Sequence, residues 1–303
     1  MGLNIEGKFF NAPNNFELNF QLRGFHMKKI FLDDTISENI TLIGNTAHHL
    51  AYSLRAKKGD KIIAVDNAGN SAVIELVDFD KEKVIAKCVG EIQKVNSVET
   101  VKIFHGDKEK IFKKFITLAE CLPKQNKFDT IVEKATELGV NKIKPLISDR
   151  TIARPGNFRA KSKLERWERI AKEAAEQSER DTIPKIFDIC ELSDWLKEIS
   201  PSLMNFHKVS NSKKIFDNKN IILIFCYENE REVPIQKILR EYKNFDCDKD
   251  IILLIGPEGG FTEHEVEEIK SYGGVSVSLG NRVLKTDTAA ISAIAAVQYE
   301  FSC

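Results

Sequence analysis

The chain has 303 residues, of which 42% are hydrophobic and 30% are charged, and its 45 basic residues balance 45 acidic ones. This composition is typical of a soluble globular protein with one large domain or two ordinary ones. Because the net charge is zero, it does not indicate a nucleic-acid partner. Only a local cluster of basic residues could indicate one.

The N-terminal segment, residues 1–26, lacks the apolar core of a signal peptide, and no apolar run approaches the ~20 residues that span a bilayer. Met27 opens a more natural domain start, so residues 1–26 form an extension of unknown role. The six cysteines are scattered, without the spacing or the neighbouring histidines of a zinc site. Scattered thiols fit a reducing compartment. We therefore expect a cytoplasmic protein that uses no metal ion.

The segment 27–98 is predicted to be a small β-barrel. Short apolar-alternating runs indicate strands at residues 29–32, 61–66, 71–79 and 83–89. Residues 67–70 form a hairpin-like connection, and one short helix fits residues 48–54. Strands this short and evenly spaced favour a closed or nearly closed barrel.

After a polar linker at residues 91–99, the chain alternates between strands and helices. Strands are predicted at residues 101–105, 142–146, 221–226, 251–255 and 275–279. Helices are predicted at residues 110–121, 128–138, 161–179 and 288–301. This alternation is typical of an α/β fold with a parallel sheet. We expect three parts: the extension 1–26, the barrel 27–98 and an α/β domain 99–303.

Two glycine-bearing strand ends are the most informative feature of the α/β domain. The apolar run 251–255 stops at the sequence Gly-Pro-Glu-Gly-Gly, residues 256–260, and Thr262 and Glu265 have the spacing of a helix capping box. The strand 275–279 runs into Gly280. Glycine corners at the ends of parallel strands favour a ligand site. The pattern is neither a Rossmann nor a P-loop motif, and a tight turn without a ligand is the alternative.

Arg282 and Lys285 follow the second corner, near the predicted start of the last helix. A cation at a helix N-terminus opposes the helix dipole, so this placement indicates a bound anionic group. The alternative is a pair of solvated charges beside a cap made by Thr286 or Asp287.

The stretch 142–172 contains ten Lys or Arg residues and three Asp or Glu residues, a surplus of seven positive charges in a neutral chain. Clustering of this kind is what phosphate contacts need. Three of these residues, Arg150, Arg154 and Arg159, fall in a predicted loop. A solvated basic helix face is the alternative.

Four stretches carry a family resemblance, and they read LPKQNKFDTIVEKATELGV, RWERIAKEAAEQSERDTIP, IGPEGGF and LGNRVLKTDTAA. Together they closely resemble the RsmE family of ribosomal RNA uracil-N3 methyltransferases. The stretches MKKIFLDD and HHLAYSLRAKKGD resemble that family's small barrel. The resemblance extends from Met27 to the C-terminus and is carried by several ordered motifs rather than by one.

The resemblance implies a SPOUT-type α/β domain with a trefoil knot, preceded by a PUA-like β-barrel that helps to dock RNA. It also implies a homodimer that uses S-adenosylmethionine as its methyl donor. The implied substrate is N3 of one uridine in small-subunit ribosomal RNA, and the implied role is in ribosome maturation.

On this basis Arg282 and Lys285 would stabilise the negative charge that develops on the uracil oxygens when N3 loses its proton. Asp287 or water would accept that proton. The donor would be held by Tyr227, Glu228, Gly256, Pro257, Glu258, Gly259, Gly260, Leu279, Gly280, Leu284, Thr288 and Ala289. The RNA backbone would be contacted by Lys28, Lys29, Arg55, Lys124, Arg150 and Arg154.

The chain departs from the family pattern at the second corner. The usual Arg-Ile-Leu-Arg-Thr-Glu-Thr-Ala reads Arg-Val-Leu-Lys-Thr-Asp-Thr-Ala at residues 282–289. The signs of the charges are kept. However, Lys285 cannot make the bidentate contact of an arginine, and Asp287 is one methylene shorter than a glutamate.

Two other functions stay open on the residues alone. The barrel and the basic stretch would also suit an RNA-binding protein without catalysis. The glycine loop would also suit a small-molecule α/β enzyme that binds phosphate there, although the basic stretch would then have no role. Binding of S-adenosylmethionine distinguishes the first alternative from an enzyme, and competition by RNA distinguishes the second.

Overall fold

The structure is a computed structural model that describes residues 27–79, 83–95, 100–105, 108–113, 115–203, 221–244 and 250–302. The predicted extension 1–26 lies outside the described residues. The chain divides into two compact units, residues 1–95 and 96–303.

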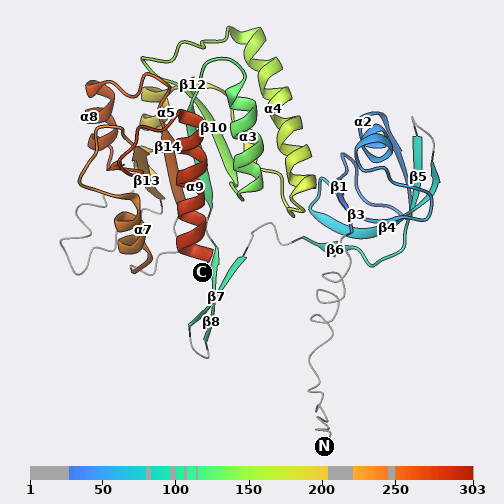
Figure 1. Cartoon of the computed structure of the whole chain (residues 1–303). Helices are drawn as coiled ribbons and strands as arrows, with labels where there is room; N and C mark the ends of the chain where they lie inside the picture. The colour runs from blue at the N-terminus through green and yellow to red at the C-terminus, as the bar shows by residue number, and fades with distance from the viewer. Residues whose placement is uncertain are drawn as a thin grey trace, which may run out of the picture. The chain divides into compact units, whose positions relative to one another are not determined.

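The first unit is a curled mixed sheet (Figure 1). Its strands are β1 (Lys29–Phe31), β2 (Asn39–Ile43), β3 (Lys61–Val65), β4 (Asn70–Phe79), β5 (Lys83–Cys88) and β6 (Gln93–Lys94). The strand order is β1-β3-β4-β5-β2, and β6 pairs with β4. Only the pair β1–β3 is parallel within this described sheet. Alternate residues turn inward and form a core that includes Ile30, Leu50, Ile62, Ile74 and Leu76.

The predicted strands of this unit are confirmed, with small shifts at their ends. Strand β2 was not predicted, although Ile40 and Leu42 alternate with exposed neighbours. The predicted helix 48–54 begins earlier than expected, as α2 (Gly44–His48), and continues as a π-helical turn, η1 (His49–Ser53).

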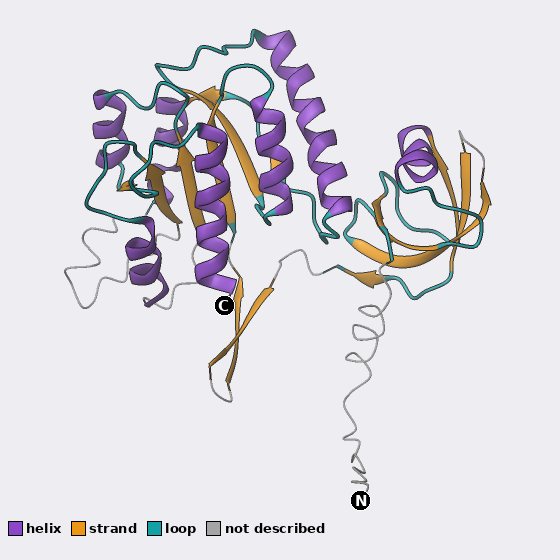
Figure 2. Cartoon of the chain, in the orientation of Figure 1, coloured by secondary structure: helices purple, strands orange, loops and turns teal. Residues whose placement is uncertain are grey.

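The second unit is built on a sheet in which every pairing between described strands is parallel. Its strands are β9 (Ile116–Cys121), β10 (Lys142–Ile147), β11 (Lys185–Ile186), β12 (Cys190–Glu191), β13 (Ile221–Cys226), β14 (Asp250–Ile255) and β15 (Val275–Val277). The order is β11-β10-β9-β14-β13-β15, with β12 paired to β10. Figure 2 shows the strands between layers of helices.

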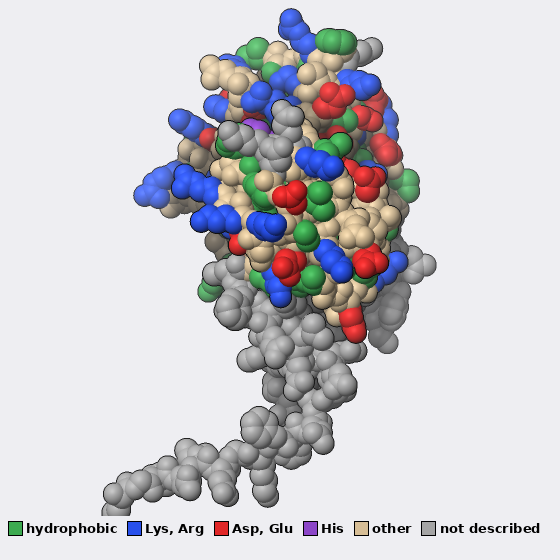
Figure 3. Space-filling view, turned by 90° about the vertical axis from the view of Figure 1, so that its right-hand side faces the viewer, with side chains coloured by type: hydrophobic (Ala, Val, Ile, Leu, Met, Phe, Trp, Pro, Cys, Tyr) green, Lys and Arg blue, Asp and Glu red, His purple; other side chains and the backbone are tan. Residues whose placement is uncertain are grey.

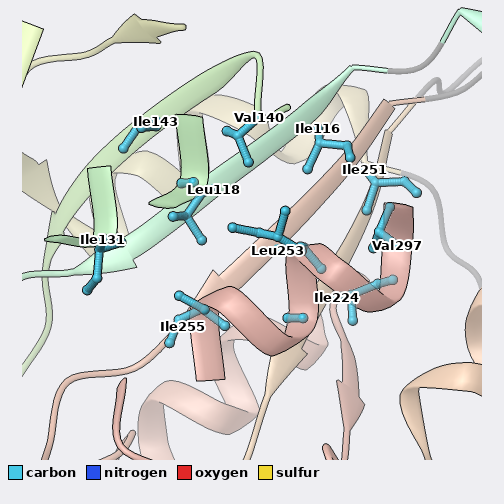
Figure 4. Packing of buried hydrophobic residues seen from close by; sticks show 14 of the residues in the cluster. Ile116, Leu118, Ile131, Val140, Ile143, Ile224, Ile251, Leu253, Ile255 and Val297 are labelled. Carbon is cyan, nitrogen blue, oxygen red and sulfur yellow. The ribbon is translucent and has the colours of Figure 1, made fainter. Parts of the chain in front are cut away.

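Helices pack against both faces of this sheet because its central strands are apolar on both sides. One face carries α3 (Lys127–Glu137), α4 (Asn157–Gln177), α7 (Ile235–Asn244) and α9 (Thr286–Ser302). The other carries α5 (Leu192–Ile199) and α8 (Glu263–Ser271). Figure 4 shows the first core, where Leu118, Ile224 and Leu253 from three strands lie near Val297 of α9.

One predicted helix is wrong. Residues 110–121 form β8 (Lys108–Lys113), which pairs with β7 (Thr100–His105), and then β9. Strand β9 lies between β10 and β14, so Leu118 faces one core while Ala119 and Cys121 face the other. Burial on both faces produces a continuous apolar run, which periodicity cannot distinguish from a buried helix.

The predicted linker 91–99 contains β6, and its residues 96–99 lie outside the described residues. Helices α5 and α7 were not predicted. None of the described helices is both long enough and apolar enough to cross a membrane.

Candidate active site

The carboxyl ends of three neighbouring strands meet at one edge of the parallel sheet. Strand β13 pairs with β14 on one side and with β15 on the other, all in the same direction. The loops that follow these strands therefore lie together, although they are far apart in the sequence. We call residues 256–260 the glycine loop and residues 278–285 the basic turn.

These segments enclose a cavity of about 350 Å³, within the range of small-molecule sites. Strand β13 and its end contribute Cys226, Tyr227 and Glu228. Ile255 and the glycine loop form a second wall. The remaining wall is formed by Val277, Ser278, Leu279, Gly280, Arg282, Val283, Leu284, Lys285, Thr286 and Ala289.

Most of the predicted donor-binding residues line this cavity, and so do Arg282 and Lys285. Thr288 and Asp287 are not part of the wall. Helix α9 begins at Thr286, and each residue of a helix is turned by ~100° from the last. Thr286 and Ala289 therefore share the face toward the cavity, whereas the two residues between them turn away from it.

The glycine loop folds tightly against the end of β13. The Gly260 amide donates to the carbonyl oxygen of Pro257 over 2.8 Å, and Gly260 has a φ of +67°. A Cβ atom at Gly260 would lie 2.0 Å from Oε1 of Glu228. Only glycine fits this position without displacing the carboxylate.

Arg150 supports the glycine loop from outside the cavity. Its Nη1 donates to the carbonyl oxygen of Gly259 over 2.7 Å and to that of Phe261 over 3.3 Å. A Cβ atom at Gly259 would lie 3.2 Å from the Cβ of Arg150, so the arginine stem packs directly on the loop. The guanidinium that was predicted to contact RNA therefore also holds this loop in place.

Glu258 anchors the loop to the neighbouring helix α3. Its carboxylate accepts hydrogen bonds from Lys127 Nζ over 2.9 Å and from the backbone amide of Lys124 over 3.1 Å. Burial acts to raise the pKa of Glu258, but these hydrogen bonds outweigh it and hold the pKa below its usual value. The same hydrogen bond raises the pKa of Lys127. The pair is therefore charged at neutral pH.

The predicted capping box is present at the start of α8. The Glu265 amide donates to Oγ1 of Thr262 over 3.2 Å, and the Thr262 amide donates to Oε2 of Glu265 over 2.8 Å. The other carboxylate oxygen of Glu265 accepts from the amide of Asp149 over 2.9 Å. This buried carboxylate thus ties the end of the glycine loop to the segment after β10.

The basic turn presents two cations that are not used by the rest of the site. Arg282 and Lys285 are exposed, and neither side chain forms a hydrogen bond or an ion pair with another described residue. The turn itself is closed by Ser278, whose Oγ donates to the carbonyl of Gly280 and accepts from its amide. Both cations are therefore available to an anionic ligand.

A buried acid lies behind the cavity wall. Glu120, near the end of β9, is fully buried, and its Oε1 lies 2.7 Å from Oγ1 of Thr286. The same hydroxyl lies 2.8 Å from the carbonyl oxygen of Gly256. Burial raises the pKa of Glu120 well above its usual value; the contact with the Thr286 hydroxyl acts to lower it, and the charges of Asp287 and Glu258 raise it further.

The other predicted RNA contacts differ in how available their side chains are. Arg154 donates to the carbonyl of Ser148 over 3.0 Å and pairs with Glu191. Lys28 donates to the carbonyl of Leu54. Lys29 is only 8% exposed, so its placement at a phosphate is not supported. Lys124 and Arg55 are exposed.

Charges of both signs are spread over the face drawn in Figure 3, with a group of Lys and Arg side chains at its left-hand edge.

Within the described residues, no group of three or more His, Cys, Asp or Glu side chains is arranged to hold a metal ion. The cavity wall carries two cations, Arg282 and Lys285.

Sequence reasoning missed part of the cavity wall. Ile255 and Val277 supply apolar surface, and the only sequence feature that could have identified them is their position at the end of a strand. Glu120 was missed because a single acid inside an apolar run does not reveal its partners. Lys127 was missed because its partner, Glu258, is distant in the sequence.

The chain is similar to known proteins over most of its length. Residues 111–298 match the RNA methyltransferase domain family, and residues 42–88 match the RNA methyltransferase PUA domain family. Ribosomal RNA small subunit methyltransferase E of Bacillus subtilis is 28% identical over 279 residues, which are 90% of this chain and 97% of that protein. Its counterpart from Rickettsia conorii is 30% identical, over 89% of this chain and 94% of that protein.

Two solved structures share the fold. Ribosomal RNA small subunit methyltransferase E from Neisseria gonorrhoeae, bound to S-adenosyl methionine, has a TM-score of 0.68 at 27% identity and covers 90% of this chain and 98% of its own. A putative methyltransferase from Legionella pneumophila, in complex with the same cofactor, has a TM-score of 0.67 at 23% identity, over 91% and 98% of the two chains. The second, at its lower identity, supports the fold alone.

Proposed function

The chain belongs to the RNA methyltransferase family, and from this premise we propose that it transfers a methyl group from S-adenosylmethionine to N3 of one uridine in small-subunit ribosomal RNA. The observation that carries the proposal is the cavity itself. Two glycine-bearing corners of a parallel sheet enclose it, and two unpaired cations lie on its wall. The relatives named above act on the same class of RNA.

The residues of the cavity fit the donor. Backbone amides of the glycine loop and of the basic turn are suited to the adenine edge and to the carboxylate of the methionine part. Glu228 adds an acceptor for hydroxyl or ammonium groups at the end of β13. The apolar side chains of Ile255, Val277 and Leu284 provide contact surface. The donor supplies a methyl group that is already activated by its sulfonium.

The chain's own contribution to the reaction is position and charge. Holding the methyl group and N3 in line can supply ~7–11 kcal/mol of the barrier. Arg282 and Lys285 would face the negative charge that develops on the uracil oxygens. Asp287 lies outside the cavity wall, which favours water over this carboxylate as the acceptor of the N3 proton.

RNA would be held by the PUA-type unit and by the basic stretch 142–172. Lys124 and Arg55 are exposed, and Arg150 and Arg154 would combine structural hydrogen bonds with a positive field. Because the proposed substrate is ribosomal RNA, we include a cytoplasmic location in the proposal.

We include a homodimer in the proposal. Val283 and Tyr299 are each 75% exposed on the last segment of the chain. A second copy of the chain would cover such apolar surface. Sedimentation or light scattering of the purified protein measures this directly, and a monomer at micromolar concentration would remove the dimer from the proposal.

The experiment that tests the function is a methyl-transfer assay with labelled S-adenosylmethionine. The RNA substrates are free small-subunit RNA, assembled small subunits and, as a matched control, large-subunit RNA. Mapping of modified nucleotides in cells with and without the gene identifies the position. We expect one N3-methyluridine in small-subunit RNA that disappears with the gene. Donor binding without methyl transfer to any of these RNAs would contradict the proposal.

A further inference from the structure

We propose that Glu120 is protonated in the folded protein and that its carboxyl group, through Thr286, locks the two glycine-bearing corners of the cavity together. This inference rests on the proposed function because the cavity is taken as the donor site. Glu120 does not line the cavity, so it acts as a positioning residue for the walls that do.

The first argument is a count of hydrogens at the Thr286 hydroxyl. Its Oγ1 lies 2.8 Å from the carbonyl oxygen of Gly256 and 2.7 Å from Oε1 of Glu120. A hydroxyl has one hydrogen to donate, and a backbone carbonyl can only accept. If Thr286 donates to Gly256, the close contact to Glu120 needs a hydrogen from the carboxyl group. A protonated Glu120 satisfies both contacts.

The ionised alternative leaves an unsatisfied contact. If Thr286 donated to a Glu120 carboxylate, its oxygen would lie 2.8 Å from the Gly256 carbonyl with no hydrogen between them. Oxygen pairs at this distance are hydrogen-bonded in proteins, because their lone pairs otherwise repel. The geometry is therefore satisfied in one protonation state only.

The surroundings of Glu120 oppose a negative charge. Its side chain is fully buried, and its Oε2 has no hydrogen-bond partner among the described residues. Asp287 on α9 has a buried Oδ1 that also lacks one. Glu258, after β14, is a further acid whose charge acts on Glu120. An isolated buried carboxylate carries a large cost, which protonation avoids.

Neighbouring groups do not supply a compensating cation. Lys127, on α3, gives its ammonium group to Glu258. Cys226, on β13, brings no positive charge, and burial raises its thiol pKa to about 12. Pro145 of β10 and Ile255 of β14, the strand neighbours of Glu120, carry no charge.

The hydrogen bonds from Glu120 through Thr286 to Gly256 connect two segments that form walls of the cavity. Gly256 begins the glycine loop, and Thr286 begins α9 at the end of the basic turn. Both line the cavity. Loss of the Glu120 proton would place a charge beside two other acids and remove the donor that Thr286 requires. The two corners would then separate, and the donor site would loosen.

The test compares Glu120→Gln and Glu120→Ala with the unmodified protein. Glutamine keeps a donor toward Thr286 at every pH, whereas alanine keeps none. S-adenosylmethionine binding is measured by calorimetry from mildly acidic to alkaline pH. The matched control is Glu165→Gln, which removes an exposed carboxylate on α4.

We expect donor affinity of the unmodified protein to fall as pH rises through the raised pKa of Glu120. Glu120→Gln should bind within about threefold of the acidic limit at every pH, and Glu120→Ala should bind about tenfold to a hundredfold more weakly throughout. Glu165→Gln should follow the unmodified protein. A Glu120→Gln variant as weak as Glu120→Ala, or one with an unchanged pH profile, would overturn the inference.

A second measurement does not depend on the donor. A carboxyl group whose pKa is higher in the folded state keeps a proton that the unfolded chain releases above about 4.5. Its contribution to stability is complete below that pH and is lost as pH rises toward the folded pKa. The unfolding free energy of Glu120→Gln should lack this loss. If the two proteins lose stability in parallel, the inference fails. If the protein shows the difference but binds no donor, the proposed function fails instead.

Discussion

Replacing Gly260 by alanine should change two quantities for different reasons. Backbone strain should lower the free energy of unfolding, and displacement of Glu228 should lower the affinity for the donor. The new Cβ would lie 2.0 Å from Oε1 of Glu228 and 2.8 Å from its Cδ. The atoms in the way belong to the end of a flexible side chain, so the carboxylate can rotate aside. The φ of +67° cannot be relieved in this way.

The size of the two effects follows from this geometry. A non-glycine residue in the left-handed region costs about 1–2 kcal/mol, and we expect the unfolding free energy to fall by that amount. Donor affinity should fall by about tenfold or more, because Glu228 leaves its place in the cavity wall. The matched control is Gly69→Ala, at φ +75° with no atom within 4 Å of the new Cβ. It should lose similar stability and no affinity.

A double-mutant cycle with Glu228→Ala completes the test. Urea unfolding should show nearly additive costs, since the backbone strain is independent of Glu228. Calorimetric titration with S-adenosylmethionine should show strong coupling, since Gly260→Ala has little left to displace once Glu228 is gone. Unchanged affinity in Gly260→Ala, or an equal loss in both backgrounds, would refute the reasoning.

Three further outcomes test other parts of the site. Arg282→Ala should abolish methyl transfer while leaving donor binding within a few-fold, as measured by single-turnover assay and calorimetry; normal turnover would remove Arg282 from the catalytic role. RNA affinity should fall steeply between low and moderate salt in a filter-binding titration, and a flat response would contradict phosphate contacts by the basic stretch. Thr262→Ala should lower the unfolding free energy by about 1 kcal/mol through loss of the capping box, whereas Thr262→Ser should not; equal unfolding midpoints would argue against the cap.

The strands of the catalytic sheet were predictable where an apolar run ended in glycine. The runs before Gly256 and Gly280 were assigned correctly because the chain must reverse at these corners. Strand β9 was predicted as a helix because both of its faces are buried. Its sequence therefore lacks the alternation of apolar and polar residues that marks a half-buried strand. Pairing with β14 and β10 determined its conformation, and pairing is not visible in the local sequence.

The glycine corners predicted the cavity, but the sequence did not show which residues of helix α9 face it. The last helix was expected to begin at Thr288 and begins at Thr286 instead. Two residues of a helix correspond to a rotation of ~200°. Thr288 and Asp287 lie outside the wall, whereas Thr286, which was not predicted, lies in it together with Ala289, which was. An end uncertain by two residues is therefore enough to exchange the residues of a site.

Counts of charge identified a basic stretch but could not show which cations are free. Arg150 holds the glycine loop, and Arg154 holds the segment after β10. Lys29 is buried within β1. Each of these roles depends on a carbonyl or a core that lies far away in the sequence. The fold thus separates cations whose side chains are held by the protein from cations whose side chains are not, such as Arg282 and Lys285.

Glu120 shows why a polar residue within an apolar strand is informative once its neighbours are known. It lies 136 residues from Gly256 and 166 residues from Thr286, so no local pattern relates the three. Burying a charged acid there would cost stability that the strand cannot recover, whereas a neutral acid needs only hydrogen-bond partners. The Thr286 hydroxyl provides one, and it provides it only while the acid is protonated. The same proton then stabilises the fold and holds the donor site closed, so stability and donor affinity should change together with pH.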